Sequence, residues 1–444
     1  MSKDNDKEDN DFEFIQEQII EKKRKKIGKY LPPMLFTVFM AILFGIIAAF
    51  TFVIAEPKIY DFMHHKKVPN TPIKIPSAYP EETEDHQEDD SEIIASEDDN
   101  ENSADLPTKP PVILETIAAD IEDFSKMYTE IKKVANQVNK SIVSVCSNIS
   151  GTDMFGEPVE KKVLTNGILI AKDNTQLYIL LSFDRVEDAS NITVEFANMI
   201  RANAVIHDYE RELNLAIISV KLEDIPFSYV NSISMATLGE SFTLSVGNPI
   251  IALGCPNGHP NSMQVGIVTS KGSFVYITDN RLDLFNTDIG DNKSSDGFIM
   301  NLKGELIGVI TRTLKQGVNE ELSTVIGISK LTGIIEKMVN KEPRTYFGVK
   351  TEDMTGEAKA YYEILNGIYV NEVKANSPAL KAGIKNGDII LEVNNQIVIN
   401  SNNFYNLISK YKPQDEVKVK IKRTSASTEK ELEVMVTLGA TEEE

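Results

Sequence analysis

Residues 34–55 read MLFTVFMAILFGIIAAFTFVIA and carry no charged side chain. The length of this run matches the ~20 helical residues that cross the hydrocarbon core of a bilayer. It follows a mostly polar stretch and ends in Ala-Glu-Pro-Lys rather than at a small-residue cleavage site, so we interpret it as an uncleaved transmembrane helix. The basic cluster Lys22 to Lys26 precedes it, and positive charge gathers on the cytoplasmic side of membrane proteins. We therefore expect a single-pass protein of the cell membrane, with residues 1–33 as a cytoplasmic tail and everything after Glu56 extracytoplasmic.

The next stretch, residues 56–111, is rich in Pro, Glu, Asp and Ser. Between Tyr79 and Asp105 it contains 13 acidic residues and no Lys or Arg. Such a segment cannot bury enough apolar surface to offset the entropy of ordering it, so we predict a disordered acidic linker. The net charge of the whole chain, -21, also argues against nucleic acid as a partner, because the phosphate backbone would be repelled.

An amphipathic helix is predicted over residues 112–140. Apolar side chains recur there at spacings of three and four, the period of one helix face. They are Leu114, Ile117, Ile121, Phe124, Met127, Tyr128, Ile131, Val134 and Val138. This stripe has two alternative partners, the folded domain that follows it or the same helix in another copy of the chain. The sequence leaves both open.

From residue 141 onward the apolar pattern changes from helix to strand. Segments such as SIVSVC, YILLSF and IIALGC recur at intervals of about 8–12 residues, separated by Gly, Asn and Asp. This pattern favours a mostly β fold of sandwiches or barrels over a parallel α/β sheet. Residues 141–340 have room for two small β-barrels, followed by a helix at LTGIIEKMVN. Residues 344–440 form a second β-rich unit with two short helices, at SPALKAG and SNNFYNLISKY.

The two cysteines, Cys146 and Cys255, are too few for a disulfide framework and lack the spacing of metal ligands. We interpret them as small buried apolar residues. One structural disulfide between them is the alternative. The sequence predicts no metal site and no cofactor.

Four stretches of the first β-rich region carry a family resemblance. They are YTEIKKVANQVNKSIVSV, GILIAKD followed by YILL, ATLGESFTLSVGNPIIALGCPNGHPNSMQVGIVTS, and NLKGELIGV. They resemble, in this order, the entry helix and first strand, the strands before the catalytic histidine, the start of the second barrel, and the strand after the catalytic serine of HtrA/Deg serine proteases. The resemblance implies a trypsin-like double β-barrel at residues 141–340.

The catalytic positions of that family fall on identifiable residues of this chain, and only the serine is retained. Counting back from NLKGELIGV puts Ser295 at the nucleophile position and Lys293 in the loop that supplies the oxyanion donors. Asp184 holds the position of the histidine, and Asn214 holds that of the orienting aspartate. The resemblance therefore implies a catalytically degenerate member, in which the base and its orienting carboxylate are both replaced.

These replacements remove the chemistry on which a serine nucleophile depends. An ordinary aspartate, with a pKa near ~3.9, is a poor acceptor for a serine hydroxyl proton. Asp296 replaces a glycine of the family and is expected to bring negative charge towards the oxyanion. His207 and His259 are the two histidines of the folded part, and neither lies at the family's position. A non-standard base, or a dyad with Lys293, is the alternative.

The second β-rich region resembles a PDZ domain. The string YFGV, which is Tyr346, Phe347, Gly348 and Val349, matches the loop whose backbone N–H groups receive the terminal carboxylate of a peptide. NSPALKAGIKNGDIILEVNNQIV matches the helix, turn and strand beyond it. Such domains bind an extended peptide at a sheet edge, so the resemblance implies peptide binding at these four residues. An ordinary tight turn at YFGV is the alternative.

Two functions follow from the resemblance, and whether the chain is an enzyme stays open. The first is a pseudoprotease that binds unfolded or C-terminal peptides of envelope proteins and acts as a scaffold or regulator in envelope protein quality control. The second is an active HtrA-type serine endopeptidase that degrades misfolded envelope proteins. A homotrimer is the assembly that the family resemblance implies.

Overall fold

The computed structural model describes residues 73, 75, 76 and 120–441, with gaps at 153, 156, 316–320 and 426–427. The expected cytoplasmic tail and transmembrane helix, most of the expected linker, and residues 112–119 of the expected helix lie outside the described residues. Within the described part, no helix is long and apolar enough to cross a membrane.

Helix α2 (Ile121–Val138) precedes the first barrel. Asp120 caps it, because its Oδ1 atom accepts two backbone N–H groups of the first turn at 2.8 and 3.0 Å. The C-terminal half of the helix packs on the fold, where Ala135 is buried. The N-terminal half does not, since Ile121 and Phe124 are 79% and 55% exposed. Docking on its own domain therefore accounts for half of the apolar stripe.

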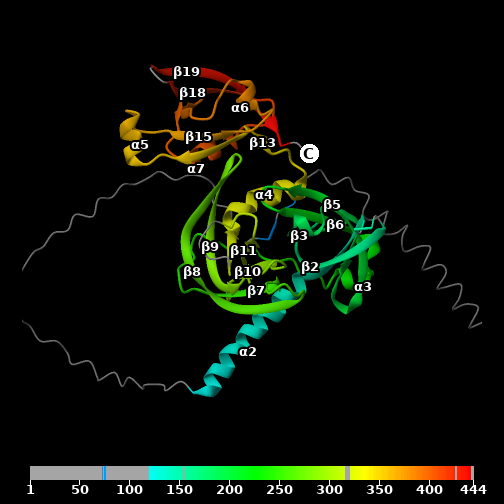
Figure 1. Cartoon of the computed structure of the whole chain (residues 1–444). Coiled ribbons are helices and arrows are strands. Elements are labelled where there is room, and N and C mark those ends of the chain that lie inside the picture. Colours follow the sequence, from blue (N-terminus) through cyan, green and yellow to red (C-terminus); the bar gives the residue numbers. More distant parts are fainter. Residues whose placement is uncertain are drawn as a thin grey trace, which may run out of the picture. The chain divides into compact units, whose positions relative to one another are not determined.

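The first six strands form a closed antiparallel barrel in the order β1-β2-β3-β6-β5-β4. Figure 1 labels β2, β3, β5 and β6 of this barrel. The strands are β1 (Ile142–Thr152), β2 (Pro158–Lys172), β3 (Gln176–Ser182), β4 (Ala189–Glu195), β5 (Arg201–Glu210) and β6 (Leu215–Lys221). Short helices interrupt or flank them at η2 (Asn139–Ser141), η3 (Phe183–Arg185), η4 (Ala197–Met199), η5 (Leu222–Asp224) and α3 (Phe227–Val230). Strands β3 and β6 are buried almost throughout, because both of their faces are covered.

A second closed barrel follows, in the order β10-β11-β12-β9-β8-β7. Its strands are β7 (Pro249–Cys255), β8 (Ser262–Ile277), β9 (Asn280–Gly290), β10 (Asp296–Met300), β11 (Leu306–Thr311) and β12 (Leu322–Gly327). Helix α4 (Ile328–Asn340) follows β12 and forms at the expected LTGIIEKMVN. Strands β8 and β9 make a long hairpin whose tip is the two-residue turn Thr278–Asp279, because Ile277 pairs with Asn280. The two barrels and α4 share an apolar cluster.

The C-terminal domain has its own core and a sheet in the order β14-β15-β16-β18-β19, which leaves β14 at one edge. Its strands are β13 (Thr345–Tyr346), β14 (Val349–Asp353), β15 (Ile368–Val373), β16 (Ile389–Val393), β17 (Gln396–Ile397), β18 (Glu416–Ser425), β19 (Thr428–Thr437) and β20 (Gly439–Ala440). Its helices are α5 (Gly356–Tyr361), α6 (Pro378–Lys381) and α7 (Ser401–Ile408). The last two form within the two expected helical segments. The expectation of a mostly β chain with a double barrel and a second β-rich unit is confirmed.

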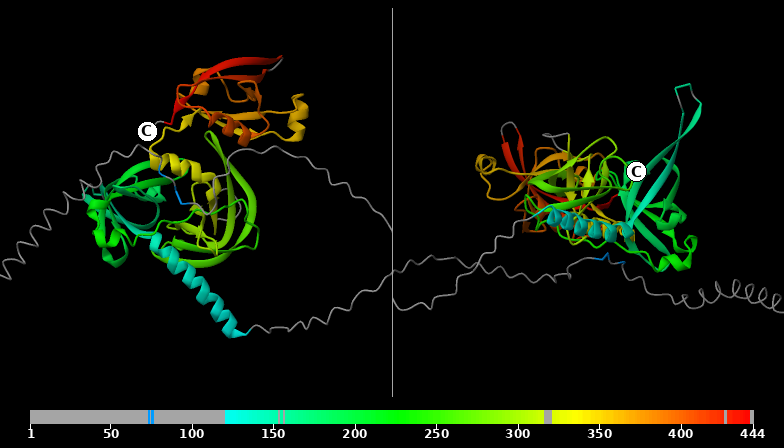
Figure 2. Two further views of the ribbon diagram at one scale, coloured as in Figure 1. Left: turned by 180° about the vertical axis from the view of Figure 1, so that it is seen from behind. Right: turned by 90° about the horizontal axis from the view of Figure 1, so that it is seen from below.

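Part of the segment expected to be a free linker packs on the folded domain (Figure 2, blue). Ile75 is only 6% exposed and joins the apolar cluster of the two barrels. The side chain of Asn340 accepts the Ile73 N–H at 2.7 Å and donates to the Ile73 carbonyl at 3.2 Å. Ile73 and Ile75 stand alone in a polar stretch and form no periodic apolar pattern. The sequence pattern therefore did not predict this contact.

The two cysteines are both free in the structure, which excludes the disulfide alternative here. Cys255 is buried on β7, as expected of a small apolar residue, whereas Cys146 on β1 is only half-buried. Burial raises the pKa of the Cys255 thiol to about 12, so this thiol is held protonated.

Candidate active site and carboxylate-binding loop

Three of the sequence-predicted site residues lie around one cavity of about 250 Å³, to which both barrels contribute. Asp184 belongs to η3, directly after β3, and Asn214 lies just before β6. Ser295 immediately precedes β10 of the second barrel. The sequence alignment therefore predicted residues that the fold brings together. Arg185 and Asp296 line the same cavity.

Asn292 makes several hydrogen bonds within the loop that contains Ser295. Ser295 is 1% exposed, and its Oγ atom accepts the backbone N–H of Asn292 at 3.0 Å. The Ser295 N–H in turn donates to the Asn292 carbonyl at 3.0 Å. The Asn292 side chain accepts the Ser294 N–H at 2.8 Å and donates to the Asn257 carbonyl at 2.7 Å. The Ser295 N–H, which an oxyanion would need, is thus already used inside the loop.

Asp184 and Asn214 pair with each other rather than with the serine. The Asn214 amide donates to Asp184 Oδ1 at 3.2 Å, and Asn214 Oδ1 accepts the Asp184 backbone N–H at 2.8 Å. An amide suits this position because two carboxylates facing each other would repel. The pair is therefore self-consistent as a structural contact. It leaves no imidazole for the serine proton.

An ion pair lines the same cavity. The Nε atom of Arg185 donates to Asp296 Oδ2 at 3.0 Å, and the Thr165 hydroxyl donates to the same oxygen at 2.7 Å. Arg185 Nε also lies 3.7 Å from Asp184 Oδ1. Burial raises the pKa of Asp296 to about 6, although Thr165 and Arg185 both act to lower it. Asp296 lines the cavity beside Ser295, as expected, and its ion pair there with Arg185 was not predicted from the sequence.

The other candidate bases lie elsewhere. His207 Nε2 hydrogen-bonds the Val339 carbonyl at 3.0 Å, and burial lowers the pKa of this histidine. His259 is exposed. The Lys293 side chain is exposed too, while its carbonyl accepts a hydrogen bond from Arg312. Among the described histidines and lysines, none hydrogen-bonds Ser295. The described residues also include no group of three or more His, Cys, Asp or Glu side chains that could hold a metal ion.

The four residues predicted to bind a peptide form a loop whose backbone N–H groups converge. Gly348 has φ +88°, a left-handed conformation that turns successive N–H groups towards one point. That point holds the carboxylate of Asp279, from the tip of the β8–β9 hairpin. Its Oδ2 atom accepts the N–H groups of Phe347 and Gly348, each at 2.7 Å, and its Oδ1 atom accepts that of Val349 at 3.0 Å.

Sequence reasoning missed two partners, Arg185 and Asp279. A signal existed for the first, since Arg185 and Asp296 are opposite charges at two positions that the same alignment places in the cleft. No such signal existed for Asp279. It lies in the turn YITDNRL, where an aspartate is an ordinary turn residue.

Comparisons with known proteins agree with this architecture. The family model of the trypsin-like peptidase domain matches residues 160–309, and that of the PDZ domain matches residues 345–437. Serine endoprotease DegS of Haemophilus influenzae is 27% identical over 297 residues, which cover 65% of this chain and 80% of that protein. A "Probable periplasmic serine endoprotease DegP-like" of Marinomonas is 26% identical over 303 residues, covering 65% of this chain and 61% of its own length. The same name is carried by a Rickettsia prowazekii protein that is 30% identical over 290 residues, 63% of this chain and 54% of that protein.

Solved structures show the same fold. The HtrA-type protease AlgW with a decapeptide superposes with a TM-score of 0.53 at 18% identity, covering 70% of this chain and 99% of that one. AlgW with a tripeptide gives a TM-score of 0.52 at 19% identity, covering 70% of this chain and 97% of that one. The described part of the chain thus contains a trypsin-like double barrel followed by a PDZ domain. The chain spans little more than half the length of some curated relatives that it matches.

Proposed function

We propose that this chain, an HtrA/Deg-like protein in which a PDZ domain follows a trypsin-like peptidase domain, is a pseudoprotease that binds peptides without cleaving them. The ligands are unfolded or C-terminal peptides of envelope proteins. The role is that of a scaffold or regulator in envelope protein quality control, carried out on the outer side of the cell membrane.

One observation carries this proposal: the hydroxyl at the nucleophile position accepts a hydrogen bond from its own loop, and no described imidazole is within reach of it. Serine attack requires a base that takes the hydroxyl proton. Asp184 is engaged with Asn214, and the Ser295 N–H is engaged with Asn292. Removal of the triad histidine alone costs about a million-fold in turnover in a comparable serine protease.

The peptide-binding half of the proposal is supported by the convergent N–H groups of the loop from Tyr346 to Val349. Three of them bind a carboxylate in this structure, which is the ligand group that such a loop receives. AlgW, which has the same fold, is known in complexes with a decapeptide and a tripeptide.

The membrane location rests on the sequence and on the names of relatives. Residues 34–55 have the length and apolarity of a membrane span, and the basic cluster before them favours a cytoplasmic N-terminus. Two relatives are named as periplasmic proteins. We accordingly place the barrels and the PDZ domain outside the cytoplasm.

The alternative function is an active HtrA-type endopeptidase. The retained Ser295 favours it, and so do the names of the relatives, which are serine endoproteases. This alternative requires the loop around Asn292 to open and a base to arrive from elsewhere. We prefer the pseudoprotease because both triad partners of the serine are replaced.

The test is to incubate the full-length protein in detergent micelles with an unfolded, fluorescently labelled substrate protein, beside the Ser295→Ala variant. We expect no fragment in either sample beyond that released by buffer. A fluorophosphonate probe gives an independent readout, because it labels only an activated serine. Cleavage or labelling that disappears in Ser295→Ala would establish the endopeptidase instead.

A further inference from the structure

The edge of the PDZ sheet that would receive a peptide is already covered by the protease domain. Strand β14 is an edge strand of its sheet, and helix α7 contacts it. An extended ligand of a PDZ domain adds to such an edge. In this chain β8 contacts β14 and β9 contacts α7, so the β8–β9 hairpin lies along the groove that a peptide would enter.

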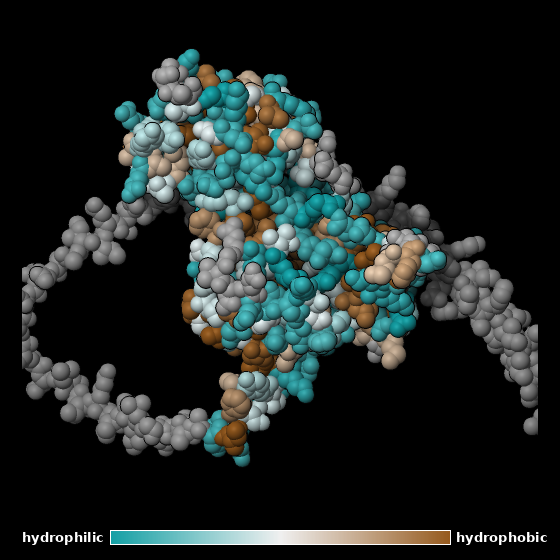
Figure 3. All heavy atoms as spheres, viewed as in Figure 1, coloured by the Kyte–Doolittle hydropathy of each residue, from teal (hydrophilic) through white to brown (hydrophobic). Residues whose placement is uncertain are grey.

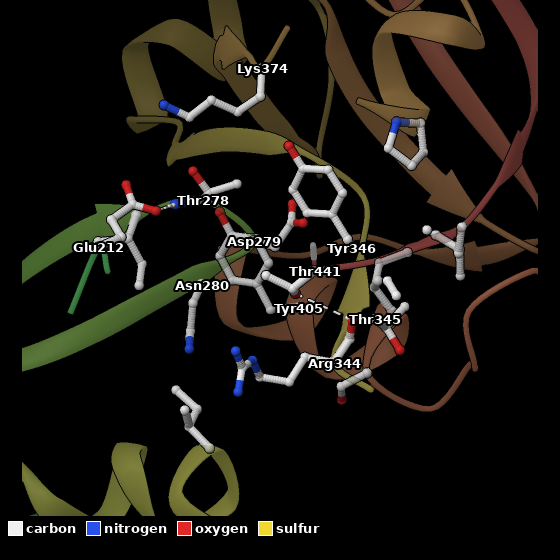
Figure 4. Close-up of a pocket in the computed structure, with 18 of the residues that line it drawn as sticks. Glu212, Thr278, Asp279, Asn280, Arg344, Thr345, Tyr346, Lys374, Tyr405 and Thr441 are labelled. Atoms are coloured by element: carbon white, nitrogen blue, oxygen red, sulfur yellow. Dashed lines mark hydrogen bonds between the residues drawn. The ribbon is translucent and has the colours of Figure 1, made fainter. Parts of the chain in front are cut away.

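The hairpin tip makes the contacts of a bound peptide end. Besides the three N–H groups that its carboxylate accepts, Asp279 donates its own backbone N–H to the Val349 carbonyl at 2.9 Å. That bond joins the hairpin tip to the backbone of β14, which remains the edge strand of its sheet. Asp279 lines a cleft of about 1450 Å³ to which both domains contribute. Figure 4 shows Tyr346 and Tyr405 near Asp279.

Further contacts follow β14 to its other end. The Asp353 N–H donates to the Tyr276 hydroxyl at 3.1 Å, and Arg281 lies 3.6 Å from the Asp353 carboxylate. Because Val349 and Asp353 are the two ends of β14, the hairpin spans the whole strand. An ordinary domain interface would not require a carboxylate on three consecutive backbone N–H groups.

We propose that the β8–β9 hairpin is an internal ligand of the PDZ domain, with Asp279 in place of a peptide's terminal carboxylate. This inference rests on the peptide-binding role proposed above. One set of N–H groups cannot hold two carboxylates, so a peptide binds only when the hairpin withdraws. Its apparent dissociation constant equals the intrinsic one divided by the fraction of molecules with the hairpin withdrawn.

The same geometry specifies what can compete. A competitor must supply a carboxylate for the three N–H groups and an extended backbone for the β14 edge. Peptides with a free C-terminus meet both conditions. Amidated peptides of the same sequence lack the charge and are expected to compete poorly.

The experiment compares the full-length protein in detergent with Asp279→Asn and Asp283→Asn variants. Asparagine keeps the size of the side chain and tolerates the left-handed backbone of residue 279, where φ is +54°, so the hairpin is expected to fold. Asp283 is the matched control, an aspartate of the same hairpin whose side chain is 55% exposed. The probe is a fluorescein-labelled decapeptide library with four randomised C-terminal residues, used with free and with amidated ends.

We expect Asp279→Asn to bind the free-carboxyl library about tenfold more tightly than the wild type, because a charge-assisted contact of the closed state is lost. Asp283→Asn should match the wild type. Hydrogen exchange at residues 347–349 should speed up in Asp279→Asn and slow again when the library is added. Equal affinities and equal exchange in all three proteins would overturn the internal ligand while peptide binding stands. If exchange is faster in Asp279→Asn but none of the three proteins binds the library, the peptide-binding role is wrong. The proposal that the hairpin competes with peptides is then wrong too.

Discussion

At the scale of single residues, the proposed pseudoprotease cleft differs from a catalytic centre by more than the replacement of the base. Ser295 shares two hydrogen bonds with Asn292, and the cleft contains the Arg185–Asp296 ion pair. Each of these contacts is satisfied without a substrate. If Asp184 and Asn214 hold the triad positions, as we propose, changing these two side chains alone leaves the contacts of Ser295 and Asp296 in place.

We predict that the double variant Asp184→His with Asn214→Asp remains inactive. The new imidazole would find a serine whose hydroxyl and N–H are both engaged, beside a buried arginine that disfavours a second positive charge. Release of fluorescence from a quenched unfolded substrate should stay within about tenfold of the Ser295→Ala background, far below the gain of about 10⁴ or more that a working triad gives. Strong proteolysis by the double variant would show that the base alone was missing.

Asp296 gives the chain a pH dependence of stability whose sign follows from its burial. Its pKa is raised from 3.8 to about 6 in the fold, so the native state holds the proton more tightly than the unfolded chain does. The native state is therefore favoured most below pH 3.8, and that advantage is lost as pH rises to about 6 and is absent above it. The groups that face the carboxyl are Arg185, Asp184, Thr165 and Cys255.

The measurement is the free energy of unfolding of the wild type minus that of Asp296→Asn, by denaturant titration from pH 4 to pH 7. This difference should fall by up to about 3 kcal/mol as the pH rises, because one pKa unit corresponds to about 1.4 kcal/mol. If the attraction of Arg185 outweighs burial, the difference will rise with pH instead, and the stated sign is wrong.

Among the structural elements, the carboxylate-binding loop depends most on one backbone conformation. Gly348 has φ +88°, and a Cβ atom added there would lie 2.2 Å from the Ser377 Cβ atom. We predict that Gly348→Ala lowers the free energy of unfolding of the PDZ domain by about 2–4 kcal/mol, since both strain and a clash result. It should also abolish binding of free-carboxyl peptides.

The matched control for that prediction is Gly356→Ala, at the start of α5. A Cβ atom at residue 356 meets nothing within 4 Å. Alanine is favoured over glycine in a helix by up to about 1 kcal/mol, so this variant should be neutral or slightly stabilising. Thermal unfolding of both variants and of the wild type measures the change in stability that each substitution causes. Equal effects of the two substitutions would contradict the role given to Gly348.

The same elements explain why the sequence predicted the fold well and the site only in part. The strands and the helices α4, α6 and α7 follow from local periodicity, and the YFGV loop follows from motif spacing. The docking of Asp279 on that loop joins residues that are far apart in the chain through backbone N–H groups. The motif predicts that the loop binds a carboxylate, but no sequence pattern indicates that Asp279 is the one that occupies it. Arg185 was within reach of prediction, because its partner Asp296 falls in the same aligned cleft.

Across the whole molecule, charged contacts tie the two domains together around the hairpin. Arg344 donates to the Asp208 carboxylate at 2.9 Å, and both side chains are largely buried. Lys350 lies 2.7 Å from Glu212, whose other oxygen accepts the Thr278 N–H at 3.0 Å. Withdrawal of the hairpin would therefore break the Glu212–Thr278 contact as well as those of Asp279. Under the proposal made above, a peptide that displaces the hairpin would also disturb β8 and β9 of the second barrel.

The exposed half of α2 carries the last prediction, which concerns self-association. Phe124 and Tyr128 are 55% and 46% exposed, and their rings lie 4.9 Å apart on one face of the helix. Figure 3 shows apolar side chains on this protruding segment. Fully burying an exposed aromatic side chain is worth roughly 1.5–3 kcal/mol, and about half of each ring is still exposed, so covering both rings is worth roughly that amount in each copy. A second copy of α2 would cover both rings with the same stripe, as in a helix bundle.

We expect Phe124→Ser with Tyr128→Ser to raise the dissociation constant of the oligomer at least about a hundredfold, which corresponds to roughly 3 kcal/mol. Sedimentation equilibrium of the full-length protein in density-matched detergent measures the mass directly. The control is Lys126→Ser with Lys133→Ser, whose side chains are 69% and 66% exposed on the same helix. If the aromatic variant keeps the mass of the wild type, or if the wild type is already a monomer, α2 does not join copies of the chain. If only the aromatic variant loses the oligomer, the exposed half of α2 contacts another copy of the chain. The buried half of α2 already packs on its own domain.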